Sequence, residues 1–280
     1  MNSTKNTFSP NQLNMEIIKK DIDRGRIRYA LFDFDGTLSL IREGWQNVMI
    51  PMMVEILLET DTNETKEELT QLVKEYVTRL TGKQTIYQMI ELKAQVEKRG
   101  GKAREPVEYK HDYLARLWQR IQHRVDGLKN GSLNKRDFVV PGTYELLDAL
   151  KEKNIVMYLA SGTDLPCVQN EVDVLGLSNY FGSHIYAALD EYKKFSKKMI
   201  IEKMLKEEKL HGPELVAFGD GYVEIENTKE VDGIAIGVAT DEVGKEHVDA
   251  WKRNRLIEAG ADIIIPHYKK LEPLLDYLFV

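Results

Sequence analysis

The sequence predicts an α/β protein: a parallel sheet with helices on both faces, plus an inserted all-helical domain. Three observations support this prediction. From residue 144 onward, short apolar runs alternate with segments of helical length, as they do in βαβ units. Residues 41–138 show apolar spacings of three and four instead, with abundant Glu, Lys, Gln, Leu and Met. An apolar run near residue 30 ends in two carboxylates.

The first predicted strand is Tyr29–Phe32, which is apolar without alternation. Runs of this kind are typical of parallel strands that are buried on both faces. Asp33 and Asp35 follow at the carboxyl end of the run, where open α/β sheets bind their ligands. A solvated turn is the alternative interpretation. Because the run requires burial, and because buried charge requires a partner or a metal, we expect a functional site here.

The helical domain is inserted directly after this site. Its apolar spacings predict four helices, namely Trp45–Thr60, Lys66–Thr81, Gln84–Arg99 and Pro106–Gly127. We therefore expect residues 1–40 and 139–280 to form a Rossmann-like core and residues 41–138 to form the helical domain.

The second part of the core supplies the remaining strands. Apolar runs between helical segments predict strands at Ile155–Ala160, His184–Ala187, Leu215–Phe218, Ile234–Val238 and Ile263–Ile265. The amphipathic segment Trp251–Arg255 is expected to be part of a covering helix. Residues 1–27 are expected to form a short helix and a connection, with a frayed tip.

Composition restricts the class of protein. A net charge of −6 and a pI near 5.7 argue against nucleic acid or an acidic membrane as the main partner. The apolar runs are too short to span a bilayer, and because the start Met1–Lys5 is polar we do not expect a signal segment. The single cysteine excludes an internal disulfide, and the histidines show no zinc-ligand spacing. We expect a cytoplasmic protein, and the sequence does not predict its oligomeric state.

Four segments together resemble the haloacid dehalogenase superfamily, in its phosphatase branch. Asp33-Phe-Asp-Gly-Thr37 is similar to the first motif of that family, and Ser161-Gly-Thr163 closes a strand as the second does. Lys197 stands at the start of a helix, and the acidic cluster Asp220–Glu224 follows another strand. Each motif alone is weak, but the ordered set is specific and covers residues 28 to about 240.

The two aspartates suit phosphoryl transfer. A phosphate ester is a dianion, so a carboxylate attacks it only where a cation and hydrogen-bond donors neutralise the charge. We expect Asp33 to be the nucleophile that forms an aspartyl-phosphate. Asp35, on the same side of an extended strand, is expected to be the general acid and then the base for water, with a raised pKa.

Oxygen ligands and a phosphate substrate favour Mg²⁺. The resemblance implies that Asp33 and Asp220 provide side-chain ligands and that Asp35 provides its backbone carbonyl. Glu224 stands where relatives usually carry Asp, so it binds the metal either directly or through water. We expect these four residues to form the metal site.

Ser161, Gly162 and Lys197 are the expected donors to the phosphoryl oxygens. An ordinary turn and helix cap is the alternative interpretation of Ser-Gly-Thr. Lys197 is chosen among neighbouring lysines because it lies three residues before the apolar pair Ile200-Ile201. Lys198 is its main competitor, and Lys194 is a lesser one.

The helical insert resembles the cap of phosphoserine phosphatase and β-phosphoglucomutase. Such a cap excludes water and selects the substrate. Candidate contacts are Gly82, Lys83 and the loop 98–104, although solvated loops are the more common explanation for basic residues beside glycines. Arg42 and Trp45 lie close to the first motif and are candidates to line the pocket.

These features predict a Mg²⁺-dependent phosphatase that acts on a small phosphorylated metabolite, with a sugar phosphate favoured. A phosphomutase with the same motifs is one alternative, and a non-catalytic phosphate-binding regulatory protein on this fold is another. A phosphonate-cleaving enzyme would require a Schiff-base lysine such as Lys83. A dehalogenase is disfavoured, because relatives with that activity lack the second aspartate, here Asp35.

Overall fold

The computed structural model describes residues 15–280, in which the strands form one seven-stranded sheet. The strand order is β1-β7-β6-β5-β2-β3-β4. The strands are β1 (Glu16–Ile17), β2 (Tyr29–Phe32), β3 (Val156–Asp164), β4 (Ile185–Ala188), β5 (Leu215–Gly219), β6 (Ile234–Val238) and β7 (Ile263–Ile265). β2 is central, with β3 on one side and β5 on the other. The chain thus reverses its winding direction beside β2, which is the kind of position where α/β sheets bind ligands.

The predicted parallel sheet is confirmed from β2 to β7, but β1 runs antiparallel to β7. The short helix expected within residues 1–27 is wrong for the described residues, because Glu16–Ile17 forms this edge strand instead. The remaining residues of that prediction, 1–14, lie outside the described part of the chain.

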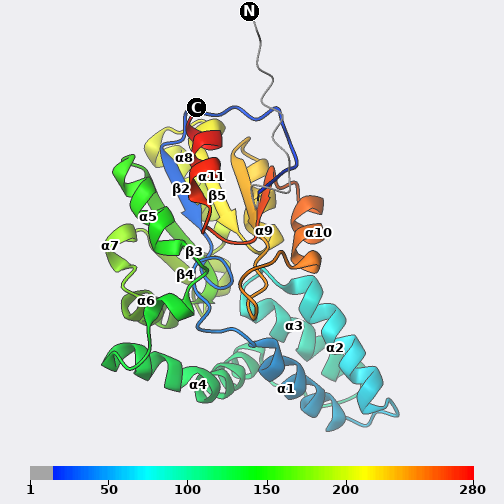
Figure 1. Ribbon diagram of the computed structural model, residues 1–280. Coiled ribbons are helices and arrows are strands. Elements are labelled where there is room, and N and C mark those ends of the chain that lie inside the picture. Colours follow the sequence, from blue (N-terminus) through cyan, green and yellow to red (C-terminus); the bar gives the residue numbers. More distant parts are fainter. Residues whose placement is uncertain (1–14) are drawn as a thin grey trace, which may run out of the picture.

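Helices cover both faces of the sheet (Figure 1). Helices α5 (Thr143–Glu152), α6 (Leu165–Leu175) and α11 (Leu271–Phe279) pack with Ala30 and Phe32 of β2. On the opposite face, α8 (Lys197–Glu208) packs with Tyr29 and Leu31. Helices α9 (Tyr222–Lys229) and α10 (Ala250–Glu258) cover β6 and β7 on that second face. A short helix, α7 (Ser178–Phe181), precedes β4.

Four further helices gather at the end of the sheet toward which β2 points (Figure 1). They are α1 (Gln46–Leu58), α2 (Lys66–Leu80), α3 (Thr85–Lys98) and α4 (Pro106–Asn130). The four helices predicted in this region therefore form, and we refer to α1–α4 as the cap. The exact domain boundaries at residues 40 and 138 stay a prediction. Among residues 15–280, no helix is both long and apolar enough to cross a membrane.

One strand differs from the prediction in a way that matters for the site. The apolar run predicted a strand that ends at Ala160, but β3 continues through Ser161 and Gly162 to Asp164. Its pairing with β4 shifts register between Ser161 and Asp164. The segment Ser161-Gly-Thr163, expected to close the strand with a turn as the alternative, is therefore part of β3 and lies beside the strand that leads to Asp33 and Asp35.

Candidate active site

The sheet brings the predicted motifs together. Phe32, the last residue of β2, pairs with Leu159 of β3 and with Phe218 of β5. The residues that follow Phe32 and Phe218 therefore leave the sheet at neighbouring points. Asp33 is the first of them, and its N–H donates to the carbonyl oxygen of Phe218 at 3.0 Å.

Lys197 lies between Asp33 and Glu224. Its ammonium is 2.9 Å from Asp33 Oδ1 and 2.8 Å from Glu224 Oε2, and all three side chains are buried. Lys197 is the first residue of α8, and the Ser196 hydroxyl caps this helix by accepting from the N–H of Met199. Of the three lysines considered, Lys197 reaches the carboxylates, whereas Lys198 and Lys194 form exposed ion pairs elsewhere.

The protonation of this cluster depends on its burial. Burial raises the pKa of Asp33 well above its usual range, Lys197 opposes the rise, and Glu224 and Asp220 add to it. Burial lowers the pKa of Lys197, but the carboxylates of Asp33 and Glu224 outweigh burial and raise it above its ordinary value. Lys197 therefore stays charged, and Asp33 requires more positive charge nearby to remain an anion.

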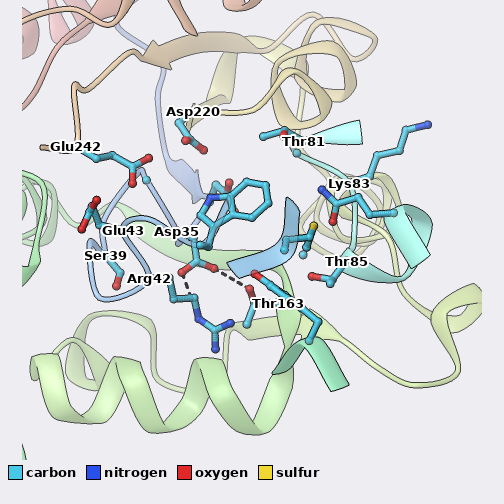
Figure 2. Close-up of a pocket in the computed structure, with 18 of the residues that line it drawn as sticks. Asp35, Ser39, Arg42, Glu43, Thr81, Lys83, Thr85, Thr163, Asp220 and Glu242 are labelled. Carbon is cyan, nitrogen blue, oxygen red and sulfur yellow. Dashed lines mark hydrogen bonds and ion pairs between the residues drawn. The ribbon is translucent and has the colours of Figure 1, made fainter. Parts of the chain in front are cut away.

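Asp35 has different partners. Its Oδ2 accepts from the Thr163 hydroxyl at 2.8 Å, and Arg42 Nε lies 3.7 Å from its Oδ1 (Figure 2). Arg42 donates to the buried carboxylate of Glu171 at 2.7 Å through one of its terminal nitrogens. Burial raises the pKa of Asp35 to about 6, Arg42 lowers it, and Glu171 raises it. Among the described residues, Asp35 Oδ1 is buried without a hydrogen-bond partner.

Asp220 is held by a third cation. Lys252 Nζ lies 2.8 Å from Asp220 Oδ2 and 2.6 Å from Glu242 Oε1. The Asp220 N–H donates to the hydroxyl of Thr37 at 3.0 Å. Gly36, at φ +76°, lies directly against this group, because a Cβ built there would be 2.2 Å from Asp220 Oδ2. Only glycine accommodates both that backbone angle and the approach of the carboxylate.

Each of these three aspartates thus shares a cation with a glutamate. Lys197 joins Asp33 to Glu224, Arg42 joins Asp35 to Glu171, and Lys252 joins Asp220 to Glu242. Sequence analysis missed Glu171, Glu242 and Lys252, and treated Arg42 only as a candidate pocket residue. Each of these three sets contains two carboxylates and one cation, so it carries one excess negative charge when both acids are ionised. The site as a whole therefore favours an additional cation.

The acidic residues offer a site for that cation. Carboxylate oxygens of Asp33, Asp220 and Glu224 lie within 4.8 Å of one another. Hard oxygen donors at this spacing fit Mg²⁺. Both Glu224 oxygens already accept a hydrogen bond: Oε1 from the Gly221 N–H at 2.7 Å and Oε2 from Lys197.

A cavity of about 100 Å³ lies between the core and the cap. We call its core side the floor, with the charged residues Asp33, Asp35, Lys197, Asp220 and Glu242. Gly162 and Thr163 also line the cavity, whereas Ser161 is buried and its Oγ accepts from the Thr163 N–H at 3.1 Å. The predicted substrate contacts of Ser161, Gly162 and Lys197 stay predictions.

We call the cap side of the cavity the roof. It consists of Met49, Thr81, Gly82, Lys83, Thr85, Gln88 and Tyr113. Figure 2 shows the side chain of Lys83 extending away from the carboxylates, and its ammonium lies over the Tyr87 ring at 5.7 Å. Trp45 and Arg42 also line the cavity, as expected. The loop 98–104 does not line it in the described structure.

A family model for haloacid dehalogenase-like hydrolases matches residues 27–232, which is most of the chain. The chain belongs to this family. The matched segment contains the four motifs and the whole cap, so the predicted family is confirmed. No curated protein sequence matches the chain.

Solved structures of haloacid dehalogenase-like proteins share the fold. One is a predicted phosphoglycolate phosphatase from Haemophilus somnus, with 13% identity and a TM-score of 0.59 over 89% of this chain and 98% of that one. A β-phosphoglucomutase from Clostridium difficile has 16% identity and a TM-score of 0.58 over 90% and 97%. A family hydrolase from Deinococcus radiodurans, solved with bound phosphate and sodium, has 16% identity and a TM-score of 0.54 over 91% and 98%.

Proposed function

We propose that this hydrolase is a Mg²⁺-dependent phosphatase that acts through an aspartyl-phosphate. The main support is the difference between the two neighbouring aspartates. Asp33 Oδ1 lies 2.9 Å from the ammonium of Lys197, whereas Asp35 accepts from the Thr163 hydroxyl and lies 3.7 Å from Arg42 Nε. Burial raises the pKa of both carboxyl groups, that of Asp35 to about 6. Two carboxyl groups held by different partners are typical of a nucleophile paired with an acid–base group.

In the first proposed step, a carboxylate oxygen of Asp33 attacks phosphorus and the bond to the leaving oxygen breaks. Asp35 gives its proton to that oxygen, so the product alcohol leaves neutral. Lys197 balances the charge of Asp33, and its proposed role is to donate to a phosphoryl oxygen. Asp35 ends this step as a carboxylate that accepts from the Thr163 hydroxyl.

In the second proposed step, Asp35 removes a proton from a water molecule. The oxygen of this water attacks phosphorus, the bond between phosphorus and Asp33 breaks, and inorganic phosphate leaves. Asp35 is again protonated and Asp33 is again an anion, so the cycle closes. The same carboxyl group serves as acid and then as base, which suits a pKa near neutral pH.

Asp33 and Asp220 are the proposed metal ligands, together with the backbone carbonyl of Asp35. Bound Mg²⁺ supplies positive charge that stabilises the phosphoryl oxygens. Because Glu224 already holds Gly221 and Lys197 through its two oxygens, we propose that it contacts the cation through water.

The roof supports a small, uncharged leaving group, with a sugar phosphate as the leading substrate class. Among residues 15–280, the side chains of Thr85, Gln88 and Tyr113 form no hydrogen bond, and the remaining roof surface includes Met49. Neutral donors and acceptors next to an apolar surface suit hydroxyl groups on a carbon ring. The orientation of Lys83 argues against a Schiff base at this position and hence against phosphonate cleavage.

The direct test is phosphate release from a panel of sugar, nucleotide and amino-acid phosphates, with Mg²⁺ or with EDTA, using Asp33→Asn as the blank. Metal-dependent release that is absent from the variant would support the proposal and identify the substrate class. If the folded protein binds Mg²⁺ but releases phosphate from no ester, the proposal is wrong. Sugar-phosphate isomers would then test mutase activity.

A further inference from the structure

The connection between α2 and α3 lies where the cap meets the core. We call Thr81–Gln84 the cap segment. Thr81, Gly82 and Lys83 line the cavity, so the place of this segment sets the distance between roof and floor. Contacts from the core hold it on two sides, and Arg255, which makes the contacts on one side, has no assigned role.

On one side, Arg255 of α10 binds the end of α2. Its guanidinium donates to the carbonyl oxygens of Arg79 at 2.9 Å and Thr81 at 2.8 Å, and also to that of Thr78. The last carbonyls of a helix lack partners within the helix and carry partial negative charge. A guanidinium with several donors in one plane is therefore well suited to hold them.

Aromatic rings hold the guanidinium in place. It lies 4.5 Å from the centre of the Tyr222 ring and 5.2 Å from that of Trp251. Tyr222 begins α9, two residues after the proposed metal ligand Asp220. The segment that carries Asp220 and the end of α2 thus share one contact, the side chain of Arg255.

On the other side, Gln84 and backbone packing hold the segment. Gln84 Nε2 donates to the carbonyl oxygens of Phe195 at 2.7 Å and Tyr192 at 3.2 Å, just before Lys197. A Cβ built on Gly221 would lie 3.0 Å from the Cα of Gly82. A Cβ built on Gly162 would lie 3.0 Å from the carbonyl oxygen of Lys83. The cap segment therefore packs tightly, backbone against backbone, on the loops that carry the motifs.

We propose that Arg255 is a positioning residue that fastens the cap segment over the carboxylates and so determines how completely the cavity closes. Its effect on turnover rests on the proposed function, but the fastening itself does not. Arg255 is absent from the lining of the cavity, so it acts on a substrate through the parts that it holds, which are the cap segment and, through the Tyr222 ring, the start of α9. Substitution should therefore impair closure while leaving the chemistry of Asp33 intact.

The first test is hydrogen exchange, measured by mass spectrometry on the full chain without ligand. Peptides that cover residues 78–88 report on the segment, in which the Lys83 N–H donates to Leu80. Arg255→Met keeps an apolar stem over Trp251 but removes all the donors. We expect exchange in these peptides to become about tenfold faster, as for the loss of hydrogen bonds from a charged donor.

Arg253→Met is the matched control, because it removes a cation from the same helix. Arg253 pairs with Glu16 in β1 and, within residues 15–280, forms no hydrogen bond or ion pair with the cap. The proposal requires unchanged exchange at residues 78–88 in this variant. Equal acceleration in both variants would overturn it, since that result would indicate general loosening of α10. Unchanged exchange in Arg255→Met would also overturn it.

Arg255→Lys provides a milder variant in case the methionine variant fails to fold. One ammonium does not reproduce a planar guanidinium that reaches three carbonyls. Intermediate exchange in Arg255→Lys therefore supports the proposal, and exchange faster than in Arg255→Met contradicts it.

A kinetic readout uses orthovanadate with Mg²⁺ as an inhibitor of p-nitrophenyl phosphate cleavage. The inhibition constant should rise about tenfold in Arg255→Met, whereas kcat for this activated ester should change less.

The two proposals fail in different ways. Faster exchange in Arg255→Met, in a wild-type protein that cleaves no ester, would support the fastening and refute the phosphatase. Turnover of esters with identical exchange in all variants would support the phosphatase and refute the fastening.

Discussion

The floor and the roof of the cavity are built from different chemistry. On the floor, the aspartates Asp33, Asp35 and Asp220 each share a buried or partly buried cation with a glutamate. Of the described residues that form the roof, Lys83 alone has a charged side chain, and it extends away from the carboxylates. The remaining roof residues are uncharged.

This difference separates two tasks. Paired charges in a closed site are fixed in place and are strongest where water is excluded, which suits a reaction that moves charge. Neutral side chains without partners can form hydrogen bonds to a ligand, and they bind the substrate and the transition state about equally well. We therefore expect floor substitutions to act mainly on kcat and roof substitutions mainly on KM.

The largest effect is expected from Asp33→Asn, which keeps shape but removes the nucleophile. Activity should fall by at least about 10³-fold, as in other enzymes that lose a covalent catalyst. Steady-state assay with phosphate detection measures the loss. Asp23→Asn makes the same change at an exposed carboxylate and should be neutral. Substantial activity in Asp33→Asn would exclude covalent catalysis at this position.

Asp35→Asn is expected to cost about 10²- to 10⁴-fold, the range typical of a general acid–base group. An ester with an activated leaving group does not require the acid, so the variant should still phosphorylate Asp33 from such a substrate. The second step then lacks its base, and a covalent phosphate adduct should accumulate in mass spectrometry of the intact protein. Wild-type rates of dephosphorylation would remove Asp35 from this role.

Lys252→Met is expected to reduce activity by about 10- to 100-fold, as for other residues that orient a metal ligand. The substitution leaves Asp220 and Glu242 without their shared cation. In the double variant Lys252→Met/Glu242→Gln the lost positive charge is matched by a lost negative charge, so part of the activity should return. A double variant that is less active than Lys252→Met would contradict charge balance as the reason for this arrangement.

Glu171→Gln should shift the pH dependence of the reaction. Glu171 raises the pKa of Asp35, so its neutralisation should lower that pKa. Because the acid works only while protonated, kcat/KM for an alkyl phosphate falls as pH rises through the pKa of Asp35. The falling limb of the pH profile should therefore move to lower pH. No movement, or movement to higher pH, would show that Asp35 is not the group that titrates.

The smallest effect is expected on the roof, from Gln88→Leu. This change keeps the volume of the side chain and removes its hydrogen-bonding group, so KM for a sugar phosphate should rise roughly threefold to tenfold, the worth of about one hydrogen bond. The value of kcat should change little. A large loss of kcat with unchanged KM would break the division between floor and roof.

Much of the floor was predictable from the sequence, because parallel strands deliver the residues after them to one edge of the sheet. Asp33, Asp220 and Lys197 come together for this reason, and the helix start at Ser196 places the lysine. The pattern of apolar runs also predicted the order of strands along the chain. It did not predict β1, whose two residues offer no periodic signal.

The missed residues lack any local signal. Glu242 lies after β6, Lys252 is one of several basic residues near α10, and Glu171 is in the middle of α6. Their roles depend on which long-range partner faces them. The contact made by Arg255 was not predictable for the same reason, because the pattern of Trp251–Arg255 indicates only a covering helix. Charged side chains on such helices are usually solvated, and only the packed structure distinguishes those that are not.

The contact between Arg255 and α2 affects which parts of the sequence can vary in evolution or design. Arg255 holds carbonyl oxygens, which every amino acid provides, rather than the side chains of Thr78, Arg79 or Thr81. The last turn of α2 is therefore free to vary in sequence while its attachment to the core persists. Side chains around the cavity can then be replaced, in evolution or by design, to alter substrate preference, while the hydrogen bonds from Arg255 to the end of α2 are kept.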